Sequence, residues 1–119
     1  DPALLVLANI EKMERVFTNL LDNAIRHSEK GGLVSIKMTM LESKLKISIK
    51  DGGCGIPPAD LPHIFEAHYR AENSAQGERT NSGLGLAITH RIVELHNSKI
   101  TVKSDVGKGS VFNFELNLV

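Results

Sequence analysis

Three polar side chains with the chemistry of a metal–phosphate site recur along one predicted helix. Asn19, Asn23 and Arg26 are spaced four and three residues apart, so at about 100° per residue they lie close together, at the edge of the apolar stripe. An Asn carbonyl oxygen suits Mg²⁺ that already carries phosphate oxygens, and an Arg guanidinium donates paired hydrogen bonds to phosphate. Ordinary solvated helix residues are the alternative, and the spacing alone does not decide between the two.

A carboxylate followed by a glycine-rich loop is the second candidate. Asp51 ends a predicted strand and precedes Gly52-Gly53-Cys54-Gly55. The carboxylate could accept a hydrogen bond from an exocyclic amine such as that of adenine, and glycines permit close approach of the backbone to a flat ring. A tight surface turn is the alternative, because Asp-Gly is common in turns.

Two further segments could help to bind an anion. Gly83-Leu84-Gly85-Leu86 opens a predicted helix after a long polar segment. The free amides of a helix start bind anions, and the helix dipole adds about 0.3–1 kcal/mol. Incidental glycines at an ordinary helix start are the alternative. Arg70 follows a stretch of aromatic residues and could reach phosphate, although a solvated arginine beside core aromatics fits equally well.

Apolar periodicity indicates two long helices and a short one. The first covers residues 11–30 and is followed by Gly31-Gly32, which are typical after a helix C-terminus. The short helix covers residues 59–65, and the second long helix begins at the Gly-Leu-Gly segment. Between these two helices, residues 70–82 are polar, and a loop of that length inside a compact domain is usually functional or mobile.

Alternating apolar and polar residues predict four strands. They cover residues 34–40, 45–49, 100–102 and 111–118, and Gly107-Lys108-Gly109 makes the turn between the last two. This order of elements predicts one α+β domain over residues 1–119. We expect a two-layer α/β sandwich, with the helices packed on one face of a mixed sheet.

The composition limits the possible classes of function. Lys plus Arg and Asp plus Glu number 14 each, so the formal net charge is zero, which argues against a general nucleic-acid footprint. The single cysteine, Cys54, excludes an internal disulfide and favours a reducing, cytoplasmic setting. No apolar run approaches the roughly 20 residues of a membrane span. Because the chain starts mid-pattern, we expect it to be part of a longer protein, whose other parts could be membrane-anchored.

Together these segments resemble the ATP-binding domain shared by histidine kinases, gyrase, Hsp90 and MutL, the Bergerat-type fold. The resemblance covers nearly the whole chain and is strongest to the sensor histidine kinases. Residues 19–27 (NLLDNAIRH) resemble the family's N box, 51–55 (DGGCG) its G1 box, 65–70 its F box and 83–86 (GLGL) its G2 box. Gly107-Lys108-Gly109-Ser110 resembles its last glycine turn. As an ordered set these motifs are highly specific.

The resemblance implies a role for each matching residue. Asn23 is expected to bind Mg²⁺, with Asn19 beside it in the phosphate site, and Arg26 to contact phosphate. His27 stands where the family often has an aromatic residue against adenine or ribose. Asp51 resembles the carboxylate that reads adenine. The implied catalytic residues are therefore the two asparagines and the arginine, with ATP and Mg²⁺ as cofactors.

The other residues implied at the nucleotide site lie in or beside the glycine segments. They are Gly53, Gly55, Ile56, Arg70, Ser82, Gly83, Leu84, Gly85 and Leu86. Residues 70–82 resemble the mobile lid over ATP. Two departures are expected not to touch the nucleotide: His96-Asn97-Ser98 replaces a frequent glycine pair, so that turn could differ, and His68 replaces a frequent apolar or aromatic residue.

Asn19 discriminates among members of the superfamily. The hydrolytic members resemble one another in a Glu at this position, which acts as a general base, and an amide cannot accept a proton in that way. The resemblance therefore implies a protein-histidine kinase. It would transfer the γ-phosphoryl group of ATP to a histidine on a separate dimerisation domain of its parent, which serves a response regulator. None of the five histidines has the sequence context of the family's acceptor, so we expect none to be phosphorylated.

Two alternatives remain open from the sequence. One is a hydrolytic ATPase of the gyrase or Hsp90 type, which Asn19 disfavours. The other is a nucleotide-binding scaffold or pseudokinase, which the intact Asn23, Asp51 and glycine segments disfavour. We expect the domain to be monomeric, because the family's dimer contacts lie mainly in the acceptor domain, and we expect no nucleic-acid partner.

Overall fold

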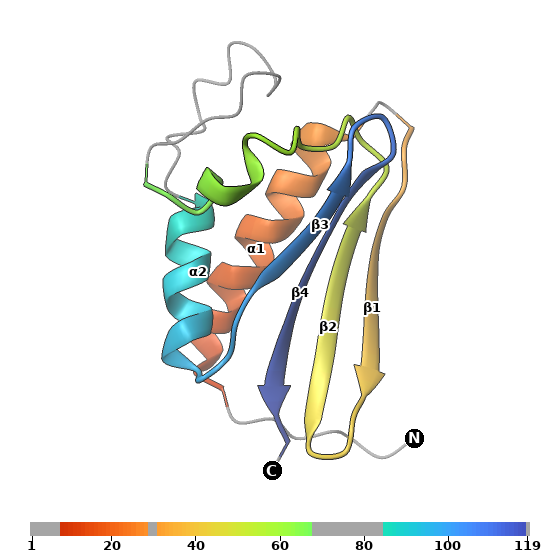
Figure 1. Cartoon of the computed structure of the whole chain (residues 1–119). Helices are drawn as coiled ribbons and strands as arrows, with labels where there is room; N and C mark the ends of the chain where they lie inside the picture. The colour runs from red at the N-terminus through yellow and green to blue at the C-terminus, as the bar shows by residue number, and fades with distance from the viewer. Residues whose placement is uncertain (1–7, 29–30, 68–84, 119) are drawn as a thin grey trace.

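The computed structural model describes residues 8–28, 31–67 and 85–118. In this part of the chain two α-helices lie on one face of a four-stranded sheet (Figure 1). The elements in chain order are α1 (Ile10–His27), β1 (Val34–Met40), β2 (Lys44–Asp51), the 3₁₀ turn η1 (Leu61–His63), α2 (Gly85–Leu95), β3 (Thr101–Asp105) and β4 (Gly109–Asn117). The predicted two-layer sandwich of α+β class is confirmed.

The sheet is antiparallel throughout its described strands, in the order β1-β2-β4-β3. β2 and β3 run in the same direction, as a crossover through α2 favours. However, β4 lies between them and pairs with both, so that Ile49 and Val102 both lie opposite Phe112. The prediction of a mixed sheet is therefore wrong for these strands, because the two parallel-running strands are not neighbours.

Helix α1 forms where its apolar residues recur at helical spacing. Met13, Val16, Leu20 and Ala24 are buried on one face. Asn9 caps the start, where its Oδ1 accepts a hydrogen bond from the Lys12 amide at 3.0 Å. The helix ends at His27 rather than at the predicted residue 30, because Ser28 is extended and its hydroxyl donates to the Ala24 carbonyl at 2.8 Å.

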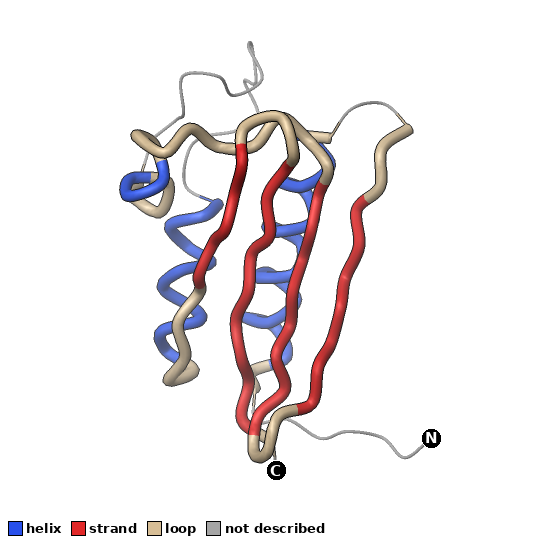
Figure 2. Tube along the Cα trace, turned by 45° about the vertical axis from the view of Figure 1, so that its right-hand side comes forward, coloured by secondary structure: helices blue, strands red, loops and turns tan. Residues whose placement is uncertain are grey.

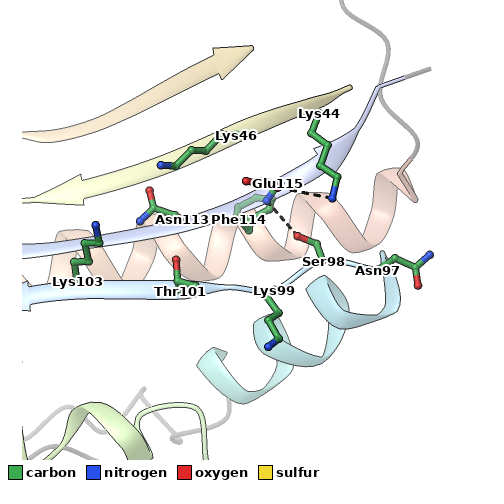
Figure 3. A pocket seen from close by; sticks show the side chains of 10 residues that line it. All are labelled: Lys44, Lys46, Asn97, Ser98, Lys99, Thr101, Lys103, Asn113, Phe114 and Glu115. Atoms are coloured by element: carbon green, nitrogen blue, oxygen red, sulfur yellow. Dashed lines mark hydrogen bonds and ion pairs between the residues drawn. The ribbon is translucent and has the colours of Figure 1, made fainter. Parts of the chain in front are cut away.

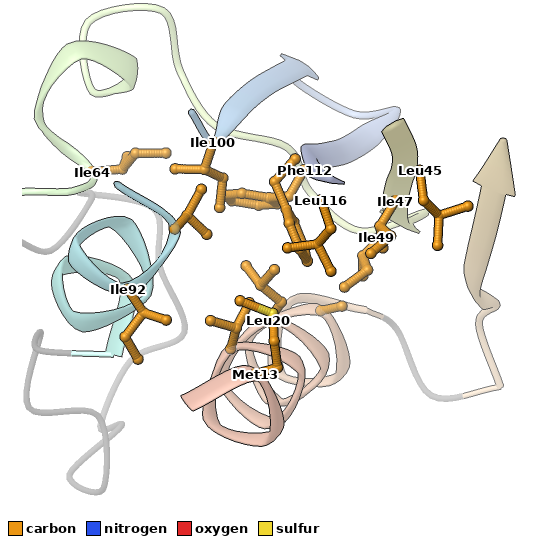
Figure 4. Close-up of a cluster of buried hydrophobic side chains, with 14 residues drawn as sticks. Met13, Leu20, Leu45, Ile47, Ile49, Ile64, Ile92, Ile100, Phe112 and Leu116 are labelled. Carbon is orange, nitrogen blue, oxygen red and sulfur yellow. The ribbon is translucent and has the colours of Figure 1, made fainter. Parts of the chain in front are cut away.

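The core lies between the helices and the inner face of the central strands (Figure 4). Alternate residues of β2 and β4 point into it, and Phe112 and Phe114 are its largest fully buried side chains. Phe17 of α1 meets Phe114 edge to face, with ring centroids 5.9 Å apart. The opposite face of the sheet carries no helix among the described elements (Figure 2).

Helix α2 ends in a C-terminal cap that has asparagine where glycine is usual. Asn97 takes a left-handed conformation (φ 58°), and its amide bonds to the Glu94 carbonyl while the Ser98 amide bonds to the Val93 carbonyl. This is the pairing of a Schellman cap, in which glycine is usual and Asn is tolerated. The glycine pair missing from this turn is thus replaced by an asparagine that does the same task.

The short helix predicted over residues 59–65 is a single 3₁₀ turn, Leu61–His63. The His63 amide bonds to the Asp60 carbonyl and the Glu66 amide to the His63 carbonyl, each at 2.9 Å, which is the i to i+3 pattern of a 3₁₀ turn. Among the described helices none is long and apolar enough to cross a membrane.

Candidate functional site

The end of α1, the end of β2 and the β3–β4 turn meet at one end of the sheet (upper end of Figure 1). Asn19 lies on α1, half-buried, and its Nδ2 donates to the Gly85 carbonyl and to Thr89 Oγ1, each at 3.3 Å. Thr89 is fully buried and donates in turn to the Gly85 carbonyl at 2.9 Å. The first turn of α2 is therefore fastened to α1 through the amide group of Asn19.

This arrangement orients the Asn19 side chain. Because Nδ2 is committed to α2, the carbonyl oxygen Oδ1 is the atom that remains for another partner. A methyl group added at Gly85 would lie 3.9 Å from Asn19 Cγ, which is ordinary contact. The structure thus brings together Asn19 and Gly85, which lie 66 residues apart in the sequence.

Asn23 and Arg26 lie on the same helix, further toward its C-terminus. Both are half-buried, and the Arg26 side chain is 21% exposed. Asp22, one turn earlier, accepts from Arg26 Nε at 3.0 Å. This contact holds one edge of the guanidinium, a group whose paired donors suit phosphate.

Asp51 ends β2 and is only 2% exposed. Its Oδ1 accepts a hydrogen bond from the Gly53 amide at 2.9 Å, which bends the chain into the loop that follows. An ionised carboxylate offers about four lone-pair sites, so this one contact leaves Asp51 able to accept from a further donor. A charged group this well buried needs such partners to offset its desolvation.

The glycine loop packs so closely against neighbouring backbone that two of its glycines have no room for a side chain. A Cβ at Gly53 would lie 1.8 Å from the His27 carbonyl oxygen, and one at Gly55 would lie 2.2 Å from the Asp105 carbonyl oxygen. Gly55 also has φ 78°, which favours glycine. These contacts bring the loop against the end of α1, as the predicted nucleotide site requires for His27.

Sequence reasoning placed Gly109 and Ser110 in the last glycine turn without assigning them to the site, and it missed Ser104. A Cβ at Gly109 would lie 2.1 Å from the Asp51 carbonyl oxygen. Ser104 Oγ accepts from the Ile56 amide at 2.7 Å and lies 2.8 Å from Ser110 Oγ. A signal existed, since Ser104 interrupts the inward-facing apolar positions of β3 and Ser110 begins β4, but nothing local links them to the glycine loop.

The predicted site is therefore assembled in part. Asn19 and Gly85 are in contact through a hydrogen bond, and Asp51, Gly53 and Gly55 form one loop against His27 and β3. Ile56 and Leu86 are partly buried against the core. Four of the predicted residues lie outside the described part of the chain: Arg70, Ser82, Gly83 and Leu84. The predicted lid, residues 70–82, lies outside it too.

The donor atoms at this end of the sheet have the chemistry that a nucleotide and its metal ion need. Among the described residues no group of three or more His, Cys, Asp or Glu side chains could hold a metal. The amide oxygens of Asn19 and Asn23 suit an ion that takes most of its ligands from phosphate and water, as Mg²⁺ does. The buried carboxylate and the close backbone of the glycine loop suit a flat ring with an exocyclic amine.

The sequence of the chain matches a known protein family and is similar to several sensor kinases. Residues 8–119 match the family described as histidine kinase-, DNA gyrase B- and HSP90-like ATPases. The sensor histidine kinase RppB of Synechocystis sp. is 39% identical over 91% of this chain, and the sensor protein SrrB of Staphylococcus aureus is 37% identical over 91%. The chain spans only 24% and 18% of the lengths of these two proteins.

Solved structures agree with the sequence relatives. The mycobacterial sensor histidine kinase MprB superposes with a TM-score of 0.86 at 28% identity, over 95% of this chain and 76% of that one. ShkA, solved at full length in complex with AMPPNP, superposes with a TM-score of 0.82 at 26% identity, over 100% of this chain and 24% of that one. Both similarities extend across the sheet and helices described above.

Proposed function

Since the chain belongs to the family of histidine kinase-, DNA gyrase B- and HSP90-like ATPases, we propose that it binds Mg-ATP and donates the γ-phosphoryl group to a histidine on a separate dimerisation domain of a two-component sensor kinase. The observation that carries this proposal is the buried Asp51 carboxylate beside a glycine loop, seated against the helix that presents Asn19 and Asn23.

The proposed unit is one catalytic domain over residues 1–119 of a longer protein. Its support is the small share of each curated relative that the chain covers. The acceptor histidine, the dimerisation domain and a downstream response regulator would then belong to or work with the rest of the parent. A cytoplasmic place for this domain, with a parent that could be membrane-anchored, is part of the same proposal.

At the adenine end, Asp51 would read the exocyclic amine. Its Oδ1 already accepts from the Gly53 amide, so the remaining lone pairs are directed by a loop that cannot shift without moving Gly53 against His27. Gly53 and Gly55 would let the loop pack against the backbone of His27 and Asp105, and Ile56 and His27 would contribute contacts beside the ring. This rigidity lowers the cost of ordering the site when nucleotide binds.

At the phosphate end, Asn23 Oδ1 would hold Mg²⁺, with Asn19 Oδ1 beside it. The bound ion would neutralise charge on the phosphate oxygens. Arg26 would donate to phosphate through its guanidinium. The start of α2, with Gly85 and Leu86, would supply amides to the same anion, together with Ser82, Gly83, Leu84 and Arg70 from outside the described residues.

Transfer to a histidine is favoured over hydrolysis by Asn19. Its amide nitrogen donates to the Gly85 carbonyl and to Thr89 Oγ1, and its oxygen is too weak a base to take a proton from water. Positioning and charge stabilisation are the main needs of phosphoryl transfer, and the acceptor imidazole would bring its own nucleophile. A hydrolytic ATPase remains the second candidate.

A transfer assay separates these functions. The chain is mixed with γ-labelled ATP, Mg²⁺ and the isolated dimerisation domain of SrrB, alongside an acceptor whose histidine is replaced by glutamine. We expect label on the histidine-bearing acceptor alone and little free phosphate. Rapid phosphate release without acceptor labelling would support the hydrolytic ATPase instead. Nucleotide binding with neither reaction, also when dimerisation domains of other relatives are supplied, would support the scaffold or pseudokinase.

A further inference from the structure

A groove of about 530 Å³ lies on the face of the sheet opposite the helices, at the end far from Asp51. It runs between the start of β2 and the turn that joins α2 to β3, across β4 (Figure 3). Four of its lining side chains are lysines: Lys44, Lys46, Lys99 and Lys103. We call this the lysine groove.

The charge of the lysine groove is strongly one-sided. Glu115 is its only acidic lining residue among those described, and its Oε1 lies 3.9 Å from Lys44 Nζ. Lys46, Lys99 and Lys103 form no ion pair with a described side chain, and the latter two are exposed. Four cations thus face one anion on a chain whose formal net charge is zero.

Protection of a sheet edge explains only some of these lysines, since Lys103 lies on the edge strand β3. Lysines often occupy edge strands, where they discourage pairing with another chain. β2 is an inner strand, paired with β1 on one side and with β4 on the other. Its outward residues nevertheless include Lys44, Lys46 and Lys50, so the charge extends from the edge strand across the open face.

We propose that the lysine groove binds an extended acidic segment of a partner protein. The lysines stand on both sides of β4, with Lys44 and Lys46 on β2 and Lys103 on β3 (Figure 3). Carboxylates spaced along a peptide can meet cations spread in this way, whereas a compact anion would face Glu115 at the centre. Ser98, Thr101 and Asn113 line the same groove and supply hydrogen bonds for a peptide backbone.

Other anionic partners fit the lysine groove less well. Nucleic acid is usually bound through Arg and stacked aromatic rings as well as Lys. The described lining contains no Arg, and its one aromatic residue, Phe114, is 1% exposed and belongs to the core. The flexible point charges of the lysines therefore suit exposed carboxylates better than they suit nucleic acid.

The lysine groove is independent of the proposed nucleotide site. Lys44 and Asp51 are the first and last residues of β2, about 23 Å apart at roughly 3.3 Å per residue. The groove also lies on the open face, whereas Asn19 and Asn23 belong to the helix layer. An acidic segment could therefore dock while the nucleotide site is free or filled.

The test uses a synthetic peptide in which glutamate alternates with serine, and a second peptide with glutamine in place of glutamate. Each is titrated into the isotopically labelled chain at low salt without nucleotide, and amide shifts are followed by NMR. We expect the acidic peptide alone to shift amides of residues 44–46, 97–103 and 113–115. Absence of binding by the acidic peptide would overturn the proposal.

Two triple variants distinguish binding in the lysine groove from non-specific attraction to positive charge elsewhere on the chain. Lys44, Lys46 and Lys103→Gln should weaken peptide binding about tenfold, since each exposed pair is worth about 0.2–1 kcal/mol. Lys12, Lys37 and Lys50→Gln removes the same charge outside the groove and should weaken it less than about twofold. Equal loss in both variants, or tighter binding of a short DNA duplex than of the peptide, would overturn the proposal. Unchanged nucleotide affinity of the first variant checks that the nucleotide site is intact.

Discussion

The two ends of the sheet are built in opposite ways. At the Asp51 end, Gly53, Gly55 and Gly109 bring backbone so close to backbone that no side chain fits. At the Lys44 end, an open groove is lined by long, solvated side chains. The first end therefore depends on backbone shape, so that adding even a methyl group to one of its glycines should lower stability strongly. The second depends on charge and should tolerate substitution.

The sharpest test of this contrast is a methyl group at Gly109. In Gly109→Ala the new Cβ would meet the Asp51 carbonyl oxygen at 2.1 Å, and φ is 107°. We expect a loss of about 3 kcal/mol in unfolding free energy, from steric overlap and backbone strain together. Denaturant unfolding measures it.

Gly107→Ala is the matched control in the same turn. Gly107 also has positive φ, 84°, but has no atom within 4 Å of the added Cβ. The expected cost is only the strain, about 1 kcal/mol. Equal losses for Gly107→Ala and Gly109→Ala would show that close backbone contact is not what shapes the Asp51 end.

The next largest effect is expected at Thr89. Thr89→Val keeps the shape of a fully buried side chain but removes its hydrogen bonds with Asn19 and the Gly85 carbonyl. We expect a loss of about 1–2 kcal/mol in unfolding free energy, together with weaker nucleotide binding because α2 is less firmly held. Thr18→Val, on an exposed position of α1, is the control. Stability as in the parent chain would break the proposed link between the helices.

A smaller effect is expected at His96, near the Lys44 end. His96 Nε2 accepts from the Asn9 amide at 3.0 Å, and Nδ1 lies 2.8 Å from the Ile92 carbonyl. His96→Ala should cost about 1 kcal/mol, because the bond with the Asn9 amide joins the end of α2 to the start of α1. Thermal unfolding measures it, with His63→Ala, in the exposed 3₁₀ turn, as the comparison. Nucleotide affinity should stay unchanged. A lower affinity would contradict the claim that the two ends of the sheet act independently.

The smallest effect is expected for single lysines of the groove. Lys46→Gln should change the unfolding free energy by less than about 0.5 kcal/mol, as surface substitutions usually do. Chemical denaturation of the variant beside the parent chain measures this. A loss of more than about 1 kcal/mol would mean that the lysine contributes to the fold rather than to a docking surface.

Local patterns predicted the elements well. Apolar residues at helical spacing located α1, and strict alternation located β1 and β2. The end of α1 was missed because a hydroxyl bond from Ser28 stops the helix before the glycines. The 3₁₀ turn was read as a helix because apolar spacing over so few residues does not distinguish i to i+3 from i to i+4 hydrogen bonding.

Non-local arrangements could not be derived in the same way. The insertion of β4 between β2 and β3 is a pairing between strands far apart in the sequence, and no local pattern records it. The hydrogen bond between Asn19 and Thr89 joins residues 70 positions apart. The motifs assign residues to a nucleotide site, and that assignment stays a prediction, whereas the orientation of the Asn19 amide required the structure.

Calorimetric titration of a non-hydrolysable ATP analogue with Mg²⁺ tests the central claim most directly. The parent chain, Asp51→Asn and the control Asp105→Asn, at an exposed position of β3, are compared. We expect micromolar binding by the parent chain and the control, roughly −8 kcal/mol, and at least about tenfold weaker binding by Asp51→Asn. Equal affinity of all three folded proteins, or no binding by the parent chain, would contradict the assignment of Asp51 to the nucleotide site.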